Sequence, residues 1–314
     1  MNVKGLSKLF TNDTSRGGGK HVLKILSCFI KPWMVPCEDI FFPIHGGKNI
    51  STVDLKMQGD DTGDNISDKN LTFGEFTAWY WAWKNIKKIY PNLEYIGLSH
   101  YRRYFAMDKI KGNGVIKTVS VPDMNGYDTL FINELKKHDI ILPKQIEFEC
   151  DLRTQYSYWH NSFDYHCIKQ IIHELSPEYD NSFNYIFEEN NKMSLYCMFV
   201  SRYTVFDEYF KWLFPILFEA ERRIDVSNYD SYQKRVFAFL AERLINVYVY
   251  HNKLNISYKP IYFITNDIDK IKIVFLLKNY VKAIIKLFIP YGILKFIKYM
   301  KKRKLSQKGY NPET

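Results

Sequence analysis

Short apolar runs that alternate with amphipathic segments constrain this 314-residue chain most strongly. Residues 22–29, 94–98 and 139–142 are short, apolar at most positions and bounded by polar residues or proline, which is typical of strands inside a sheet. These runs lie in the first half of the chain, and helical patterns separate and follow them. That order predicts an α/β fold with a mainly parallel sheet flanked by helices and a helical C-terminal half.

The helical segments show apolar side chains at spacings of three and four residues. One begins near Thr72 and carries Phe76, Trp79, Tyr80 and Trp83 on one stripe. From Pro143 to about residue 250 the pattern is mostly helical, with the clearest segments at 205–218 and 230–250. We therefore expect long helices to cover the sheet after the third strand.

Basic charge is concentrated at one end of the chain. The formal net charge is +10, yet residues 270–308 hold twelve Lys or Arg and no Asp or Glu, which leaves 32 basic residues to balance 34 acidic ones. A near-neutral body without a recognised nucleic-acid motif argues against nucleic-acid binding. An apolar face with lysines at residues 278, 282 and 286 favours an amphipathic helix on an anionic membrane surface. The alternative is a core helix with a solvated lysine face.

Three parts are expected from these patterns. Residues 1–21 are rich in Gly, Ser, Thr and Asn and predict a flexible leader; residues 22–265 form the main domain, and 266–314 the basic tail. Five scattered cysteines without a Cys-x-x-Cys pair predict reduced thiols in a cytoplasmic protein and no zinc site. No signal-peptide pattern is present, and no apolar stretch is long enough to predict a membrane-spanning helix.

The strand at 94–98 leads directly into His100, Tyr101, Arg102 and Arg103. Ligands of open α/β sheets sit at the carboxyl ends of the strands. Two adjacent arginines there would be costly to bury without anions, and guanidinium groups match phosphate oxygens well. The segment predicts a diphosphate site in which His100 binds a phosphate or a sugar hydroxyl. The alternative is a structural ion pair with a nearby carboxylate.

The acidic loop at 60–65 contains Asp60, Asp61, Asp64 and Asn65. It lacks the terminal Glu of a calcium loop, because Leu71 stands at the twelfth position. Its carboxylates and amide could hydrogen-bond to sugar or ribose hydroxyls, or one carboxylate could act as a base. The alternative is a solvated turn.

A third group lies in the predicted helix at 230–250. Arg235, Glu242 and Arg243 are seven and eight residues apart and so share one side of the helix. Glu242 held among arginines would be ionised. It is either a general base for an acceptor hydroxyl or a structural partner of the arginines.

His160 ends the aromatic stretch 156–160. Aromatic rings stack on the apolar faces of sugars, so this stretch is a candidate platform for an acceptor sugar. The alternative is an ordinary surface or core histidine.

Six segments together resemble one bacterial family. They are residues 43–48, 59–67, 80–85, 97–105, 141–144 and 239–244, and they occur in order over about residues 22–262. The family is that of the capsular-polysaccharide glycosyltransferases, which carry a His-Tyr-Arg-Arg-Tyr-Phe motif and were first catalogued as a domain of unknown function. The leader and the basic tail lie outside the resemblance.

The resemblance implies a GT-A-like, Rossmann-type transferase in capsule, O-antigen or exopolysaccharide synthesis. Its donor would be a nucleoside diphosphate sugar, with UDP-galactose or UDP-galactofuranose as examples, and its acceptor a lipid-linked glycan at the inner face of the cell membrane. We assign diphosphate binding to His100, Arg102 and Arg103. The candidate catalytic bases are Glu242, Asp60, Asp61 and Asp64. Donor or acceptor binding is assigned to Asn65, Lys144, His160, Arg235 and Arg243.

The chain departs from the family pattern at two places. Cys197 stands where the family usually has Asn, and Cys cannot replace the hydrogen bonds of an amide. No Asp-x-Asp metal motif follows the strand at 94–98, which continues into Ser99, His100 and Tyr101. The hypothesis is that the two arginines replace the metal, with Mn²⁺ or Mg²⁺ as the alternative. A non-catalytic assembly or regulatory protein of a polysaccharide locus is the rival function.

Overall fold

The computed structural model describes residues 22–108 and 114–265. The expected leader at 1–21 and the expected amphipathic tail at 266–314 lie outside the described residues. The main domain belongs to a compact unit that ends at Ile264. Among the helices of the described ranges, none combines the length and the apolar character needed to cross a membrane.

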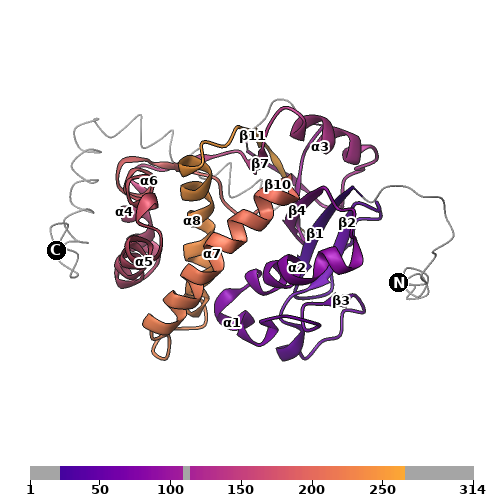
Figure 1. Cartoon of the computed structure of the whole chain (residues 1–314). Helices are drawn as coiled ribbons and strands as arrows, with labels where there is room; N and C mark the ends of the chain where they lie inside the picture. The colour runs from indigo at the N-terminus through magenta and orange to yellow at the C-terminus, as the bar shows by residue number, and fades with distance from the viewer. Residues whose placement is uncertain (1–21, 109–113, 266–314) are drawn as a thin grey trace, which may run out of the picture. The chain divides into compact units, whose positions relative to one another are not determined.

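Twelve strands and eight α-helices make up the described ranges (Figure 1). The strands are β1 Leu23–Phe29, β2 Phe41–His45, β3 Gln58–Gly59, β4 Tyr95–His100, β5 Arg103–Phe105, β6 Val115–Thr118, β7 Ile140–Pro143, β8 Ile146–Glu147, β9 Lys192–Met193, β10 Phe199–Arg202, β11 Ile256–Lys259 and β12 Ile261–Ile264. The helices are α1 Asn70–Phe73, α2 Phe76–Ile89, α3 Tyr127–Leu135, α4 Leu152–Trp159, α5 Ser162–Leu175, α6 Asp180–Asn184, α7 Tyr203–Arg223 and α8 Val236–His251. Single 3₁₀ turns lie at Lys48–Ile50, Ser67–Lys69, Pro177–Tyr179 and Gln233–Arg235, and a π turn at Tyr185–Glu189.

The main sheet has the strand order β11-β7-β10-β4-β1-β2-β3. Its centre is parallel: β1 pairs with β2 on one side and with β4 on the other, and β7 pairs in parallel with β11. β10 is the reversed strand, antiparallel to both β4 and β7. The predicted α/β fold with a mainly parallel sheet is confirmed. The expectation of mostly helix from 143 to 250 misses β10, which is four residues long and so carries little periodicity.

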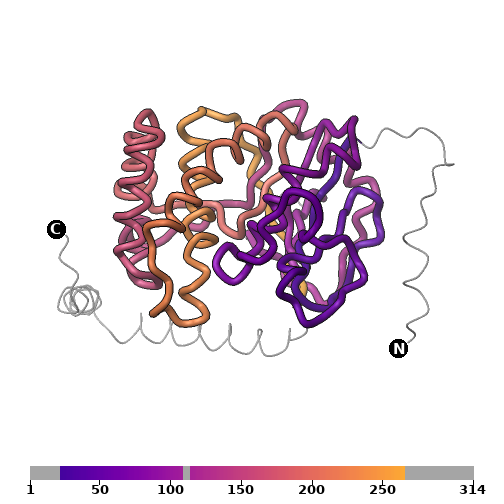
Figure 2. Tube along the Cα trace, turned by 60° about the horizontal axis from the view of Figure 1, so that its bottom comes forward, coloured from indigo at the N-terminus to yellow at the C-terminus, as the bar shows by residue number. Residues whose placement is uncertain are grey.

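Side chains of the central strands alternate between two hydrophobic cores. Leu26 and Cys28 of β1 face a large core with α2, α7 and α8. Leu23 and Ile25 face a smaller core with α3, β5 and β12. All seven residues of β1 are buried, because helices or strands cover both faces of the sheet. Figure 2 shows α8 beside the layer formed by α4 to α6.

The corner between α1 and α2 carries Glu75 toward the end of the sheet. Gly74 has φ 54° and ψ −135°, a conformation open almost only to glycine. The Asn70 side chain donates to the Gly74 carbonyl at 2.7 Å and to the Thr77 hydroxyl at 2.9 Å, which closes the turn. The predicted stripe of α2 is present, and Trp81 on the other side is buried as well, against Phe42.

The predicted helix at 230–250 begins later than expected. The Asp230 carboxylate accepts hydrogen bonds from the backbone N–H groups of Tyr232 and Gln233, which favours a 3₁₀ turn at Gln233–Arg235 before α8. Arg235 therefore stands at the N-terminal end of α8, beside the α1–α2 corner.

Candidate active site

A cleft of about 670 Å³ lies at the carboxyl ends of β1 and β4 and is closed on its other sides by the α1–α2 corner, α4 and α8. Its position agrees with the rule that open α/β sheets bind ligands at this edge. The structure brings seven of the residues predicted from the sequence into this one cleft. They are His100, Arg102, Arg103, His160, Arg235, Glu242 and Arg243.

Arg102 and Arg103 form the cationic end of the cleft. Within the described residues, no carboxylate forms an ion pair with either guanidinium, so the alternative of a structural ion pair is not observed. The Arg103 guanidinium lies 4.8 Å from the Tyr196 ring, and the Arg102 Nε is buried without a hydrogen-bond partner. Burial, and next the charge of Arg102, lower the pKa of Arg103 from its usual value. Two neighbouring guanidinium groups that have no carboxylate partner within the described residues are suited to bind an anion.

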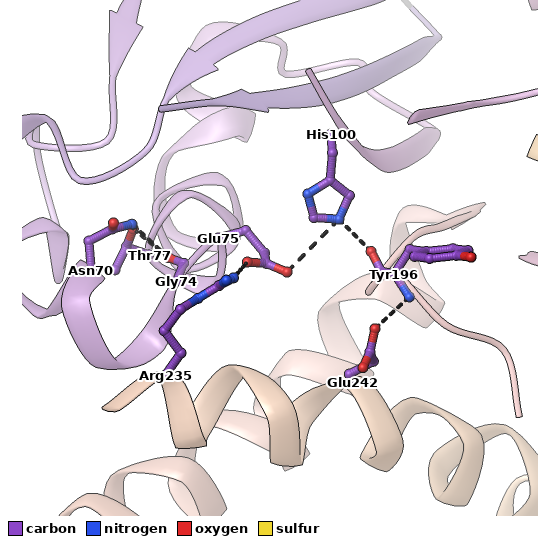
Figure 3. A network of polar contacts seen from close by, with 8 residues as sticks. All are labelled: Asn70, Gly74, Glu75, Thr77, His100, Tyr196, Arg235 and Glu242. Atoms are coloured by element: carbon purple, nitrogen blue, oxygen red, sulfur yellow. Dashed lines mark hydrogen bonds and ion pairs between the residues drawn. The ribbon is translucent and has the colours of Figure 1, made fainter. Parts of the chain in front are cut away.

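His100 ends β4 with its ring held by the protein. Its Nε2 lies at hydrogen-bond distance from the backbone carbonyl of Tyr196 and 3.9 Å from Oε1 of Glu75 (Figure 3). Because a carbonyl only accepts, Nε2 carries the proton and donates. Burial lowers the pKa of His100 although Glu75 opposes this, which favours the neutral ring. The remaining nitrogen, Nδ1, is then an acceptor, which suits a hydroxyl better than a phosphate.

Glu75 is a cleft residue that sequence reasoning missed. Its Oε2 lies 3.1 Å from Nη2 of Arg235, and the Cys197 thiol donates to the same carboxylate. Burial would raise the pKa of Glu75, but His100 and Arg235 hold it below the usual value. Glu75 is therefore an ionised structural partner and a poor base. In the sequence it is one polar residue at the start of a helix, and nothing local marks it.

Glu242 lies on α8 between the cationic end and the aromatic side of the cleft. Its Oε1 accepts the backbone N–H of Tyr196 at 2.7 Å, and Oε2 is 3.8 Å from Nη1 of Arg243. Burial raises the pKa of Glu242 above its usual value, although Arg243 opposes this. The sequence argument considered only the arginine neighbours of Glu242 and expected an ionised carboxylate; it did not include burial. A partly exposed carboxylate with a raised pKa has the properties of a general base.

Aromatic rings line the cleft on the α4 and α8 side. The His160 ring stacks on Phe239 at 4.2 Å between centroids, and its Nδ1 lies 3.1 Å from Oε1 of Gln233. Burial, and next the charge of Arg243, lower the pKa of His160 to about 4, so the ring is neutral at neutral pH. Trp159 and Tyr232 keep 65% and 52% of their surface exposed. Large exposed rings on a cleft wall are suited to stack on a sugar.

Arg243 is held in place by neighbours that also line or border the cleft. Its Nη2 donates to Oε1 of Gln155 at 2.7 Å and its Nη1 to the Phe239 carbonyl at 2.8 Å. Its guanidinium lies 4.8 Å from the Tyr156 ring and is almost fully buried. Gln155 is a further residue that sequence reasoning missed, because its partner is 88 positions away.

The loop at 60–65 does not reach the cleft. Asp60 is fully buried and accepts from the backbone N–H groups of Gly47 at 2.8 Å and Lys48 at 3.0 Å, and from the hydroxyls of Ser67 and Thr77. These four donors occupy its carboxylate and make it a structural clamp.

The other predicted residues of this group also lie away from the cleft lining. Asp61 is exposed, the Asp64 carboxylate accepts the Tyr80 hydroxyl at 3.1 Å, and the Asn65 amide oxygen accepts the backbone N–H of Ser67. Lys144 follows β7, where its backbone N–H bonds to the Lys259 carbonyl. Their assignments to catalysis or binding stay predictions without support from location.

The cleft does not fit a divalent cation. The carboxylates among its described lining residues are Glu75 and Glu242, and both lie beside guanidinium groups. Within the described ranges, no three His, Cys, Asp or Glu side chains cluster as metal ligands do. At the end of β4, where an Asp-x-Asp pair would bind Mn²⁺ or Mg²⁺, the chain presents His100 and Arg102 instead.

Residues 24–253 match the family model described as a domain of unknown function, DUF4422. The chain belongs to this family. Among solved structures it is similar to the bifunctional glycosyltransferase WbbM in its apo form, with 30% identity and a TM-score of 0.69. That match covers 78% of this chain and 45% of the other, so the chain spans less than half the length of WbbM. No curated protein matches the chain.

Proposed function

We propose that this DUF4422 protein is a glycosyltransferase that moves a sugar from a nucleoside diphosphate sugar to a saccharide hydroxyl. The observation that carries the proposal is the order of groups in the cleft. Two arginines that form no ion pair with a carboxylate of the described residues lie at one end, a carboxylate with a raised pKa lies in the middle, and exposed aromatic rings lie at the other end. The likeness to part of WbbM supports the same reaction class.

In this proposal the donor diphosphate lies against Arg102 and Arg103. Their guanidinium groups neutralise the charge that develops on the diphosphate as its bond to the anomeric carbon breaks. The acceptor sugar stacks on Trp159 and Tyr232. Glu242 takes the proton of the acceptor hydroxyl as the acceptor oxygen bonds to the anomeric carbon, and the nucleoside diphosphate leaves.

Finer features of the reaction rest on the family resemblance. We propose a UDP-sugar donor, with galactose or galactofuranose as the sugar, and a lipid-linked glycan of capsule, O-antigen or exopolysaccharide synthesis as the acceptor. The identities of the donor, the sugar and the acceptor are proposed from the ordered sequence motifs and not from the geometry of the cleft. The cytoplasmic location at the inner membrane face belongs to the same proposal.

A donor screen tests the function. Release of UDP or another nucleoside diphosphate is measured with each sugar nucleotide, with membranes from the source as acceptor, and binding is measured by calorimetry. We expect release with at least one donor. Binding of donors without release, over long incubation with acceptor, would contradict the enzyme and favour the non-catalytic assembly protein.

The role of the arginines is tested by Arg103→Gln. The matched control is Arg202→Gln, because Arg202 pairs with Asp139 outside the cleft. We expect the Arg103 variant to bind the nucleoside diphosphate at least about tenfold more weakly, since one charge-assisted bond to phosphate contributes about 1.5–3 kcal/mol. The control should bind as the wild type does. Equal affinities for the two variants would remove Arg103 from the donor site.

Metal dependence is tested separately. We propose that the two arginines supply the stabilisation that a bound cation gives in related enzymes, so transfer should continue in EDTA. Activity that disappears in EDTA and returns with Mn²⁺ or Mg²⁺ would refute this part of the proposal and leave the reaction class intact.

A further inference from the structure

The segment between β9 and β10 bends through two left-handed residues in succession. Tyr196 has φ 79° and Cys197 has φ 50°, in a region that residues with a Cβ seldom adopt. Strain of this kind persists only where surrounding contacts hold it, and it is concentrated at functional sites. Both residues line the cleft.

The backbone of Tyr196 joins two residues of the site. Its N–H donates to Oε1 of Glu242 at 2.7 Å, and its carbonyl accepts from Nε2 of His100 (Figure 3). One residue therefore connects the proposed base on α8 with the end of β4. A flip of either neighbouring peptide would break one of these two bonds.

The side chains of the same two residues contact charged groups of the cleft. The Tyr196 ring lies 4.8 Å from the Arg103 guanidinium. Burial, with Glu75 next, raises the pKa of the Cys197 thiol well above its usual value, so the thiol stays protonated and donates to Glu75. Glu75 in turn pairs with Arg235 at 3.1 Å. The turn is therefore held by contacts with four residues, which are Glu242, His100, Arg103 and Glu75.

We infer that the Tyr196–Cys197 turn is a positioning element that fixes Glu242 relative to the diphosphate site, with its left-handed backbone as the essential feature. The inference rests on the proposed function, because it concerns the placement of the proposed base. Tyr196 and Cys197 act through Glu242 and His100 and are not catalytic residues themselves.

The turn also influences the protonation of Glu242. The charged groups that face Glu242 are Arg243 on α8, Arg103 on β5 and Glu75 at the start of α2, together with the Tyr196 N–H. A hydrogen bond donated to the carboxylate favours its charged form. Loss of the turn would remove that donor, so the pKa of Glu242 would rise.

The test compares two substitutions that both remove the thiol. Glycine adopts a left-handed backbone without strain, whereas a β-branched residue strongly disfavours it. Cys197→Gly therefore keeps the turn and Cys197→Val opens it. Lys253→Val is the matched control, because Lys253 has φ 52° and is exposed outside the cleft. If the valine variant does not fold, Cys197→Ala replaces it as a milder change of the same kind.

Two readouts are expected to separate the variants. In Cys197→Val, kcat should fall by about 10²-fold, the scale of a base displaced by about 1 Å, while KM for the donor stays close to that of the wild type. The pKa of Glu242, followed by carbon NMR of labelled glutamate and assigned with Glu242→Gln, should rise. Cys197→Gly should retain most of kcat and the wild-type pKa, and Lys253→Val should lose only thermal stability.

Two results would overturn the inference. One is equal behaviour of the glycine and valine variants, which would assign the effect to the thiol. The other is a valine variant that loses only thermal stability, as the control does. If the wild type transfers no sugar, the proposed function fails. The NMR titration then still decides the inference, because a pKa shift confined to the valine variant supports it and an unchanged pKa refutes it.

Discussion

At the scale of single residues, carboxylates of the same type differ in role because their neighbours differ. Asp60 is surrounded by four donors and holds a loop together. Glu242 has one backbone donor and a guanidinium at 3.8 Å, and burial raises its pKa. Only a carboxylate that is incompletely satisfied can accept a proton from a substrate. This contrast favours Glu242 over Asp60 as the proposed base.

Glu242→Gln should lower kcat by about 10²–10⁴-fold, the contribution of a general base, and leave nucleotide binding close to that of the wild type. Because the pKa of Glu242 is raised and the base must be deprotonated, the ascending limb of kcat/KM should lie above 4.5, its usual value. Steady-state kinetics across pH measure both. Glu208→Gln is the control, since Glu208 is exposed on α7. A glutamine variant with the wild-type pH profile would exclude Glu242 as the base.

At the scale of elements, the loop before α1 depends on Asp60 to join β2 to α2. Asp60→Asn replaces one acceptor oxygen by an amide group that faces donors. We expect the free energy of unfolding to fall by about 2–4 kcal/mol, as for buried donors left unsatisfied. Urea unfolding measures this. The neighbouring exposed residue provides the control, because Asp61→Asn should change stability by less than about 0.5 kcal/mol. Equal effects would contradict the clamp.

Helix α5 contains a buried carboxylate that links stability to pH. Asp164 accepts from the Tyr229 hydroxyl at 2.6 Å and from Tyr156 at 3.4 Å, yet burial raises its pKa to about 6. Because the pKa of Asp164 is higher in the folded chain than in the unfolded chain, its contribution to stability is fully present below about pH 3.8. That contribution is lost as the pH rises through about 6. The shift of the pKa from 3.8 to about 6 corresponds to about 3 kcal/mol of unfolding free energy.

Asp164→Asn should remove this pH dependence. The difference in unfolding free energy between variant and wild type should move in favour of the variant by about 2.5 kcal/mol between pH 4 and pH 7. Chemical unfolding at both pH values measures the difference, and titration of all other groups cancels in it. A difference that stays constant with pH would show that Asp164 has an ordinary pKa.

At the scale of the whole molecule, the candidate active site and the excess positive charge lie in different parts of the chain. The cleft belongs to the described residues, whereas the excess positive charge lies in residues 270–308. We propose that this tail holds the enzyme at an anionic membrane surface beside its acceptor, with each basic residue contributing about 1 kcal/mol.

Replacement of Lys301, Lys302, Arg303 and Lys304 by Gln in the full chain should weaken binding to anionic vesicles by about 10³-fold, from about 4 kcal/mol. Co-sedimentation with phosphatidylglycerol vesicles measures binding, and neutral vesicles give the background. The control neutralises four exposed lysines of the main domain, which are Lys136, Lys137, Lys192 and Lys253. If both fourfold variants bind alike, the tail does not anchor the protein.

The sequence by itself determined the features that depend on neighbours along the chain. Continuous apolar runs indicate buried strands, so β1, β4 and β7 were predictable. The cationic end of the cleft was predictable because Arg102 and Arg103 are adjacent in the sequence. The spacings of seven and eight residues likewise placed Arg235, Glu242 and Arg243 on one side of the predicted helix, although Arg235 lies in the 3₁₀ turn before α8. β10 was missed because four residues carry too little periodicity.

The tertiary structure alone decided which of these groups meet. Glu75 and Arg235 are 160 positions apart, and His100 and Tyr196 are 96 apart. No local pattern reports such contacts, because they form only when the sheet and α8 pack together. Burial adds an effect that the sequence does not report: desolvation outweighs the arginine beside Glu242 and raises its pKa. The strained turn at Tyr196 exists for the same reason, since only the packed cleft supplies the partners that hold it.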